Sequence, residues 1–165
     1  TPSLMRVVQD RRTQKDAVDL LTFLQEARGR SVARGGAVRI TFNAGQYTMD
    51  EAMVDINTDG TPDVPLGRCG GAGVIWQPIA SRGSSTRSQA TVNTDVHTGA
   101  PTTLPNLQVC FTPRGRMLSW DGAAWVAVNQ VFSYRFEVRD GGGVVASAKD
   151  RWVHLAPNGI ARMEL

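Results

Sequence analysis

A run of oxygen-bearing side chains in the first half of the chain, DINTDGTPD, has the spacing of a calcium-binding loop. In an EF-hand loop, side-chain oxygens stand at alternate positions, and this run places oxygens at Asp55, Asn57, Asp59 and Asp63. Gly60 occupies the sixth position, where the loop turns sharply, and Thr61 would contribute its backbone carbonyl. Hard oxygens suit a hard cation, so the pattern predicts a Ca²⁺ site.

The same run departs from an EF-hand at its end. Leu66 stands where a bidentate glutamate is expected, and Pro62 and Pro65 exclude a following helix. A calcium site here would therefore lie outside an EF-hand, with Asp50 or Glu51 completing the ligand set. The alternative is a loop of Asx turns, for which aspartate, asparagine and glycine are also the preferred residues.

Cys69 and Cys110 are the only two cysteines, without a CxxC motif or a nearby pair of histidines. Metal ligation and redox catalysis are therefore poorly supported. A disulfide formed in an oxidising compartment would stabilise the chain by about 4 kcal/mol in the chain-entropy model. Two buried free thiols are the alternative.

The basic side chains are almost all arginines, and the net charge is +3. Arg114, Arg116 and Arg162 belong to a series on the C-terminal strands and turns that would offer a surface to DNA or to another anionic partner. Acidic residues such as Asp121 and Asp150 are interleaved with that series. Cross-strand ion pairs are therefore the alternative interpretation.

No residues are arranged for catalysis. The chain has no GxSxG, no phosphate-binding glycine loop and no HExxH, and His97 and His154 are far apart. The tryptophans fall in predicted strands and most simply build the core; they are Trp76, Trp120, Trp125 and Trp152. We therefore expect no enzyme and no cofactor other than Ca²⁺.

One long helix, expected from Pro2 to Arg34, is the first element that must position these groups. Its packing face is predicted from residues at helical spacing: Ala17, Leu20, Leu21, Leu24 and Ala27. Gly35 and Gly36 end the helix, because glycine tolerates the left-handed conformation at a helix C-terminus. The apolar stripe lapses near Arg11 and Arg12, so the first turns are expected to project beyond the domain.

After residue 36 the pattern alternates as in β-strands. Strands are expected at 38–42, through 47–56, and at 74–80, 107–112, 116–120, 125–129, 131–140, 144–148, 151–156 and 160–165. The polar segment 81–106 is expected to be mostly loop, with an exposed hairpin around 90–96. Short intervals allow only antiparallel connections, which predicts one α+β domain over 1–165, helical in 1–36 and β-rich in 37–165.

Three segments together resemble the GspH/FimT type of pilins and pseudopilins. LLTFLQEARGRSVARGGAVRITF (20–42) is similar to the helix end and first strand of that family, and VCFTPRGR (109–116) to a later strand and turn. VHLAPNGIAR (153–162) resembles its last strand pair, whereas 43–106 aligns poorly. The resemblance implies a long N-terminal helix packed on antiparallel sheet.

The resemblance also implies a function. Members carry a prepilin leader and an apolar helix that anchors the subunit in the inner membrane and later packs in a filament. Minor members sit in low copy, often at the tip, where they help to start assembly. Some bind DNA through a G-R-x-R motif, of which this chain keeps Gly159 and Arg162 and lacks the first arginine.

We therefore predict a minor pilin of a type IV pilus, in the tip or priming complex of a bacterial cell-envelope filament. Its partners would be other pilins and a tip adhesin. The alternatives are a pseudopilin of type II secretion and a DNA-binding pilin for DNA uptake.

Overall fold

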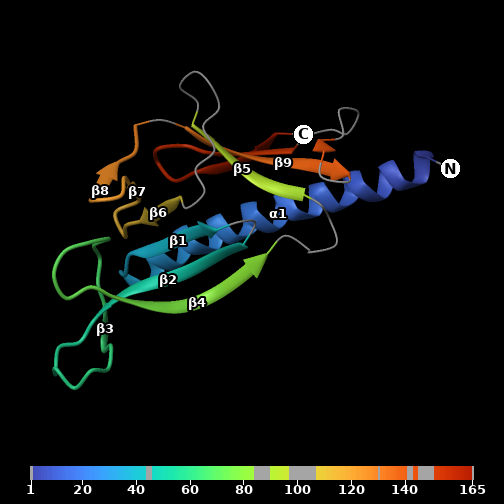
Figure 1. The fold of residues 1–165 in the computed structure, drawn as a ribbon. Helices are drawn as coiled ribbons and strands as arrows, with labels where there is room; N and C mark the ends of the chain where they lie inside the picture. The colour runs from blue at the N-terminus through green and yellow to red at the C-terminus, as the bar shows by residue number, and fades with distance from the viewer. Residues whose placement is uncertain are drawn as a thin grey trace.

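A computed structural model describes residues 2–43, 46–83, 90–96, 107–129, 131–140, 143–144 and 151–164. Within these residues one helix is followed by twelve strands (Figure 1). In chain order they are α1 (Pro2–Arg34), β1 (Val38–Asn43), β2 (Gln46–Val54), β3 (Val64–Pro65), β4 (Ile75–Gly83), β5 (Ala90–Val96), β6 (Gln108–Phe111), β7 (Met117–Trp120), β8 (Trp125–Ala127), β9 (Phe132–Asp140), β10 (Gly143–Val144), β11 (Arg151–Leu155) and β12 (Ala161–Glu164).

Helix α1 has the predicted bounds and is 33 residues long, which corresponds to about 50 Å. It ends because Gly35 takes a φ of 70°, and its N–H donates to the carbonyl of Ser31 at 3.0 Å. Gly36 is required by space, since a Cβ there would lie 2.9 Å from the Cβ of Pro65. The chain can therefore turn directly into β1.

The first sheet contains seven strands. Its order is β3-β2-β1-β6-β7-β8, and β4 pairs with β2 along most of its length. The β1–β2 hairpin pairs Val38 with Glu51 and Phe42 with Tyr47. Buried residues alternate along β1, whereas residues 49–53 of β2 are all buried. All strand pairs in this sheet are antiparallel, as expected from the short connections.

The second sheet contains five strands in the order β10-β9-β11-β12, with β5 also paired to β9. Strand β5 occupies 90–96, where an exposed hairpin was expected. The segment instead pairs with β9 over its whole length, from Ala90 opposite Val138 to Val96 opposite Phe132. Most of the predicted strand at 144–148 and the segment 97–106, which contains His97, lie outside the described residues.

Helix α1 packs across both sheets and contacts β1, β6, β9, β11 and β12. Its fully buried side chains include Ala17, Leu20, Phe23, Leu24 and Ala27, while Leu21 is half-buried. The ring of Phe23 meets Tyr47 of β2 edge-on at 4.8 Å, and Phe42 of β1 stacks on Tyr134 of β9 at 4.6 Å. These contacts join the helix and both sheets in one core, and the α+β class is confirmed.

Two sets of ion pairs fasten α1 near its ends. At the N-terminal side, Arg151 of β11 donates to Asp10 at 2.9 Å. At the C-terminal side, Arg30 and Arg34 donate to Glu51 of β2 at 3.1 and 2.8 Å, and the Glu51 side chain is only 3% exposed. We call Arg30, Arg34 and Glu51 the Glu51 cluster.

The only two tyrosines of the chain are both buried, which leads to a prediction about alkaline pH. Burial, followed by the negative charge of Asp19, raises the pKa of Tyr47 to about 12, and burial alone raises the pKa of Tyr134 well above its ordinary value. Unfolded tyrosines ionise near pH 10, so the contribution of the two tyrosines to the free energy of unfolding should be constant below about pH 10 and fall as the pH rises toward 12.

The measurement is phenolate absorbance recorded with circular dichroism during an alkaline titration. Phenolate should be absent near pH 10 and should appear together with loss of the native spectrum. A titration centred near pH 10 in a protein that keeps its native spectrum would contradict this expectation.

Candidate functional site

The loop between β2 and β3 contains the residues predicted to bind Ca²⁺. One carboxylate oxygen of Asp55, Oδ2, accepts from the N–H of Gly60 at 2.7 Å and closes the turn. Asp63 Oδ2 accepts from the N–H of Ile56 at 3.1 Å, and Asp59 Oδ1 accepts from Thr61 at 2.7 Å. Only the bond from Thr61 to Asp59 has the spacing of an Asx turn, and the other two bonds reach across the loop, so part of the acceptor capacity is used by the loop itself.

The other oxygen of Asp55 behaves differently. Its Oδ1 is buried and has no hydrogen-bond partner among the described residues. Within the same described parts of the chain, no three acidic, histidine or cysteine side chains converge as a preformed metal site. The geometry thus leaves one buried carboxylate oxygen unsatisfied, and Ca²⁺ binding stays a prediction.

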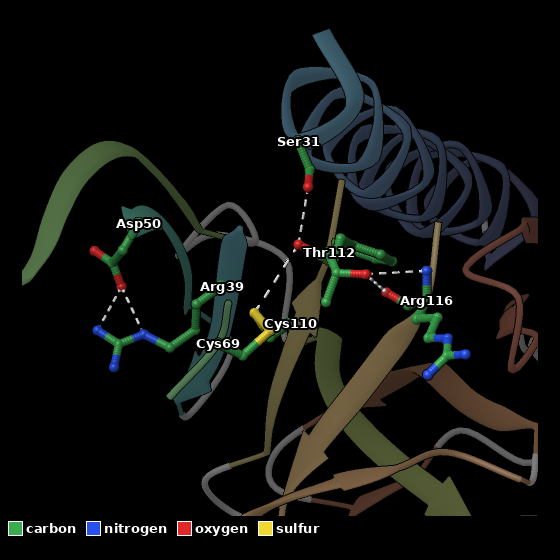
Figure 2. The surroundings of a disulfide bond; sticks show 8 residues. Ser31, Arg39, Asp50, Cys69, Cys110, Thr112 and Arg116 are labelled. Carbon is green, nitrogen blue, oxygen red and sulfur yellow. Dashed lines mark hydrogen bonds and ion pairs between the residues drawn. A yellow bond between two sulfur atoms is a disulfide. The ribbon is translucent and has the colours of Figure 1, made fainter. Parts of the chain in front are cut away.

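Cys69 and Cys110 form a disulfide, as predicted, at a sequence separation of 41. The bond joins the loop before β4 to strand β6, and Figure 2 shows it beside the end of α1. There Ser31 donates its buried hydroxyl to the carbonyl of Phe111 at 2.9 Å, so the helix is hydrogen-bonded to the same strand. On the other side Arg39 donates twice to Asp50, at 2.8 and 3.1 Å.

A surface hollow of about 620 Å³ opens next to the disulfide. Residues 68–71 of the disulfide loop form one wall, and Trp76, Trp120 and Trp125 form the others, from β4, β7 and β8. We call this site the tryptophan hollow. The prediction that the tryptophans build the core holds in part. Trp76 and Trp125 pack on the small core cluster around the disulfide, whereas Trp120 is 36% exposed and Trp152 is half-buried beside His154.

The arginines proposed as a DNA surface are spread over two places. Arg114 and Arg116 lie on the turn between β6 and β7, and Arg162 lies on β12 opposite His154. All three are exposed, and none forms an ion pair with a described residue. Among the described side chains these three arginines form no cross-strand ion pair, and Arg151 pairs with Asp10 of the helix. DNA binding stays a prediction.

His154 joins two residues in an arrangement that has the composition of a nucleophilic triad. Its Nδ1 lies 2.8 Å from the hydroxyl of Ser133, and its Nε2 lies 2.9 Å from a carboxylate oxygen of Glu164. The Ser133 side chain is fully buried, and its strand is paired on both sides with β5 and β11. A substrate cannot reach this hydroxyl, and the arrangement gives no support to hydrolysis.

A second hollow, of about 440 Å³, lies between the C-terminal half of α1 and the turn before β12. Its lining is mostly small or apolar and includes the exposed residues Val32 and Ile160. Arg28 also lines it, is half-buried, and has a buried Nε without a hydrogen-bond partner among the described residues. We call it the Arg28 groove.

Sequence reasoning missed both hollows and the Glu51 cluster. Each is assembled from segments more than ten residues apart, which periodicity does not connect. A weak signal existed for the tryptophan hollow: Gly70, Gly71 and Gly73 adjoin Cys69, which marks a tight loop beside a disulfide.

The described residues define an α+β protein with one long N-terminal helix on antiparallel sheets. No helix among them combines the length and apolarity needed to cross a membrane.

Two solved structures are similar to this chain, both of the type IV minor pilin FimU of Pseudomonas aeruginosa strain PAO1, in space groups P21 and P65. Each is 14% identical; the TM-scores are 0.48 and 0.46, and the alignments cover 92% of this chain and 87% and 92% of FimU. The likeness concerns the fold alone. No family model matches the chain, and the comparison with curated proteins finds no match.

Proposed function

We propose that this protein is a structural subunit of a type IV pilin-like filament, a minor pilin of the complex that starts assembly. The observation that carries the proposal is the N-terminal end of α1, which extends beyond both sheets (Figure 1). The sequence resemblance to GspH/FimT-type pilins in the helix end and the last strands supports the same function. Its partners would be other pilins and a tip adhesin, at the cell envelope.

The projecting turns carry an exposed apolar stripe. Leu4, Val7 and Val8 are 69%, 50% and 47% exposed. The first buried residue described on the helix is Thr13. Positions i, i+3 and i+4 lie on one helix face, so the three side chains form a continuous seam. Because each side chain is already partly buried, covering what remains exposed would contribute about 1–2 kcal/mol per residue, which favours a helix–helix contact with neighbouring subunits.

The Arg28 groove supports a protein partner independently of that stripe. It follows the same helix toward its C-terminal end and combines apolar walls with the half-buried Arg28, whose Nε has no hydrogen-bond partner among the described residues. An acidic side chain from an adjoining subunit would satisfy this charge and cover Val32 and Ile160. In this proposal α1 is the surface along which subunits meet.

The test is filament number by electron microscopy after deletion of the gene and complementation. We expect the deletion to cut piliation severalfold and the Leu4→Glu/Val7→Glu variant to fail to restore it. The matched control is Gln14→Glu, which adds charge at an exposed polar position of the same helix and should restore filaments. The purified Leu4→Glu/Val7→Glu variant should be as stable as the wild-type protein, since surface substitutions usually change the free energy of unfolding by less than about 0.5 kcal/mol. Unchanged filament numbers in the deletion strain would refute the proposal.

Two alternatives give different outcomes in the same strains. A pseudopilin of type II secretion would leave pili intact and reduce the secretion of exoproteins. A DNA-uptake pilin would leave filament number intact and bind DNA in a gel shift that weakens with salt and with Arg162→Ala.

For the loop between β2 and β3 we propose a Ca²⁺ site built on Asp55, Asn57, Asp59, Thr61 and Asp63. The buried, unpartnered Oδ1 of Asp55 supports it, because a cation would satisfy an oxygen that no described donor reaches. With no bidentate glutamate at the end of the loop, we expect an affinity of about 0.1–1 mM, as in extracellular calcium modules.

Isothermal calorimetry and thermal unfolding with Ca²⁺ or a chelator test the site. Heat of binding and a higher Tm should disappear in Asp55→Asn/Asp59→Asn and persist in Asp19→Asn, a helix control. If the wild-type protein gives no heat and no thermal shift at millimolar Ca²⁺, the loop is held by its own hydrogen bonds alone.

A further inference from the structure

The tryptophan hollow remains unexplained by a role in filament assembly. We propose that it is a binding site for a neutral saccharide. The inference stands on this site's own geometry and is independent of the proposed function. In Figure 1 the strands that form it, β4, β7 and β8, reach the end of the molecule opposite the N-terminus of α1. A ligand could therefore approach without meeting the helix.

The three indoles form inclined walls. The ring centroids of Trp120 and Trp125 are 5.5 Å apart at 59°, and those of Trp76 and Trp125 are 6.2 Å apart at 52°. All three rings remain partly exposed, and Trp120 is 36% exposed. Flat apolar faces set at an angle suit a ligand that has apolar faces of its own, as the C–H face of a pyranose ring does.

The polar side chains at the hollow are donors. None of the three indole N–H groups donates to another described residue, and the single charged side chain of the lining is Arg68. Arg68 Nη2 donates to the carbonyl of Ala72 at 2.8 Å and so braces the loop. Indole N–H groups beside apolar faces call for a ligand that supplies acceptors, such as hydroxyl and ring oxygens.

Local charge argues against two other ligand classes. A quaternary ammonium is disfavoured because the guanidinium of Arg39 already lies 4.4 Å from the centroid of Trp76, and no carboxylate side chain lines the hollow. A nucleic acid is disfavoured because Arg39 is neutralised by Asp50, which leaves only Arg68 to meet a phosphate backbone. A neutral ligand with apolar faces and oxygens fits the remaining chemistry.

The hollow is also preorganised. A Cβ at Gly70 would lie 2.7 Å from Cδ1 of Trp125, so only glycine lets the loop approach this ring. The disulfide then holds Cys69, next to Gly70, against β6. Packing on the disulfide cluster accounts for Trp76 and Trp125, but it does not account for the exposed ring of Trp120 or for the open volume. A rigid loop reduces the entropic cost of ordering a site around a ligand.

The test uses the purified protein and four neutral disaccharides: maltose, cellobiose, lactose and N,N′-diacetylchitobiose. Binding is followed by tryptophan fluorescence and by the shifts of the indole N–H signals in NMR. We expect at least one sugar to bind saturably below about 10 mM and to shift the indole signals of Trp120 and Trp125. Preference for the acetylated sugar would indicate a cell-wall glycan, and preference for a hexose disaccharide an exopolysaccharide or surface glycan.

Variants locate the binding. Trp120→Ala should weaken it about tenfold, the equivalent of one lost aromatic contact, and Trp120→Phe should restore most of it. Trp152→Phe, on β11, is the matched control and should bind as wild type does. The proposal is overturned if no sugar binds, if Trp120→Ala binds equally well while folded, or if a proline-rich peptide or a single-stranded oligonucleotide binds more tightly than every sugar. Because these assays use the isolated subunit, their failure says nothing about filament assembly.

Discussion

Replacing Cys69 and Cys110 together by serine is expected to lower the free energy of unfolding by about 4 kcal/mol. The disulfide closes a loop whose ends are 41 residues apart, and without it the unfolded chain regains the conformational freedom of that loop. A loss of this size is a large part of the stability of a typical domain. The denaturant concentration at the midpoint of unfolding should therefore be much lower for the variant than for the wild-type protein. Denaturant titration followed by circular dichroism measures it.

The same experiment contains its control. Reductant should destabilise the wild-type protein by a similar amount and should leave the double serine variant unchanged, because the variant has no disulfide to lose. A loss below about 1 kcal/mol would mean that the contacts of the small core around Ala37 and Ala52 hold the loop without the covalent bond.

Local patterns predicted much of the fold. The bounds of α1 follow from a helical stripe that ends at Gly35, and β1 follows from the alternation of Val38, Ile40 and Phe42. These signals lie within a few residues of one another, so the sequence displays them directly. The antiparallel connections follow in the same way from short turns such as Asp121-Gly122.

What could not be predicted depends on contacts between distant segments. The division into two sheets and the pairing of β5 with β9 are decided by which strands meet around the helix. The four tryptophans illustrate the limit: their types favour burial, but burial depends on which face of which sheet each one occupies. Trp120 lies on the short strand β7, next to the last strand of its sheet, and so stays exposed.

The candidate sites differ in the same way, because some are contiguous in sequence and others are assembled from distant segments. The calcium loop is contiguous, so its spacing could be read from Asp55 to Asp63, although the burial of Asp55 Oδ1 and the hydrogen bonds that cross the loop could not. The disulfide was one of two open alternatives because the spacing of two cysteines does not fix their distance. The tryptophan hollow and the Arg28 groove are each lined by two or more elements, so neither could be predicted from a single segment.

The Glu51 cluster is the polar contact whose disruption should have the largest effect. Its carboxylate is 3% exposed and receives both Arg30 and Arg34, whose side chains are 31% and 48% exposed. The carboxylate is therefore buried, whereas the two arginine side chains are partly exposed. Removing the arginines leaves an uncompensated buried carboxylate, whereas removing the carboxylate leaves two cations that can turn to water.

This asymmetry predicts an order of stabilities. Arg30→Gln/Arg34→Gln should lose about 3–5 kcal/mol, the cost of breaking a buried ion pair from one side. Glu51→Gln should lose only about 1–2 kcal/mol, because glutamine keeps the shape and some hydrogen bonding. The triple variant should then be more stable than the double arginine variant, since the stranded charge is gone.

Denaturant unfolding of the three variants measures the order, and Lys15→Gln is the matched control. Lys15 pairs with Asp19 on the same helix, but both side chains are well exposed, so its loss should cost less than about 0.5 kcal/mol. If the triple variant is less stable than the double arginine variant, the arginines matter through packing of their stems and not through Glu51. If the predicted order holds, the end of α1 is fixed to β2 by this charge, which keeps the helix in place on the sheet while its exposed N-terminal turns bind a neighbour.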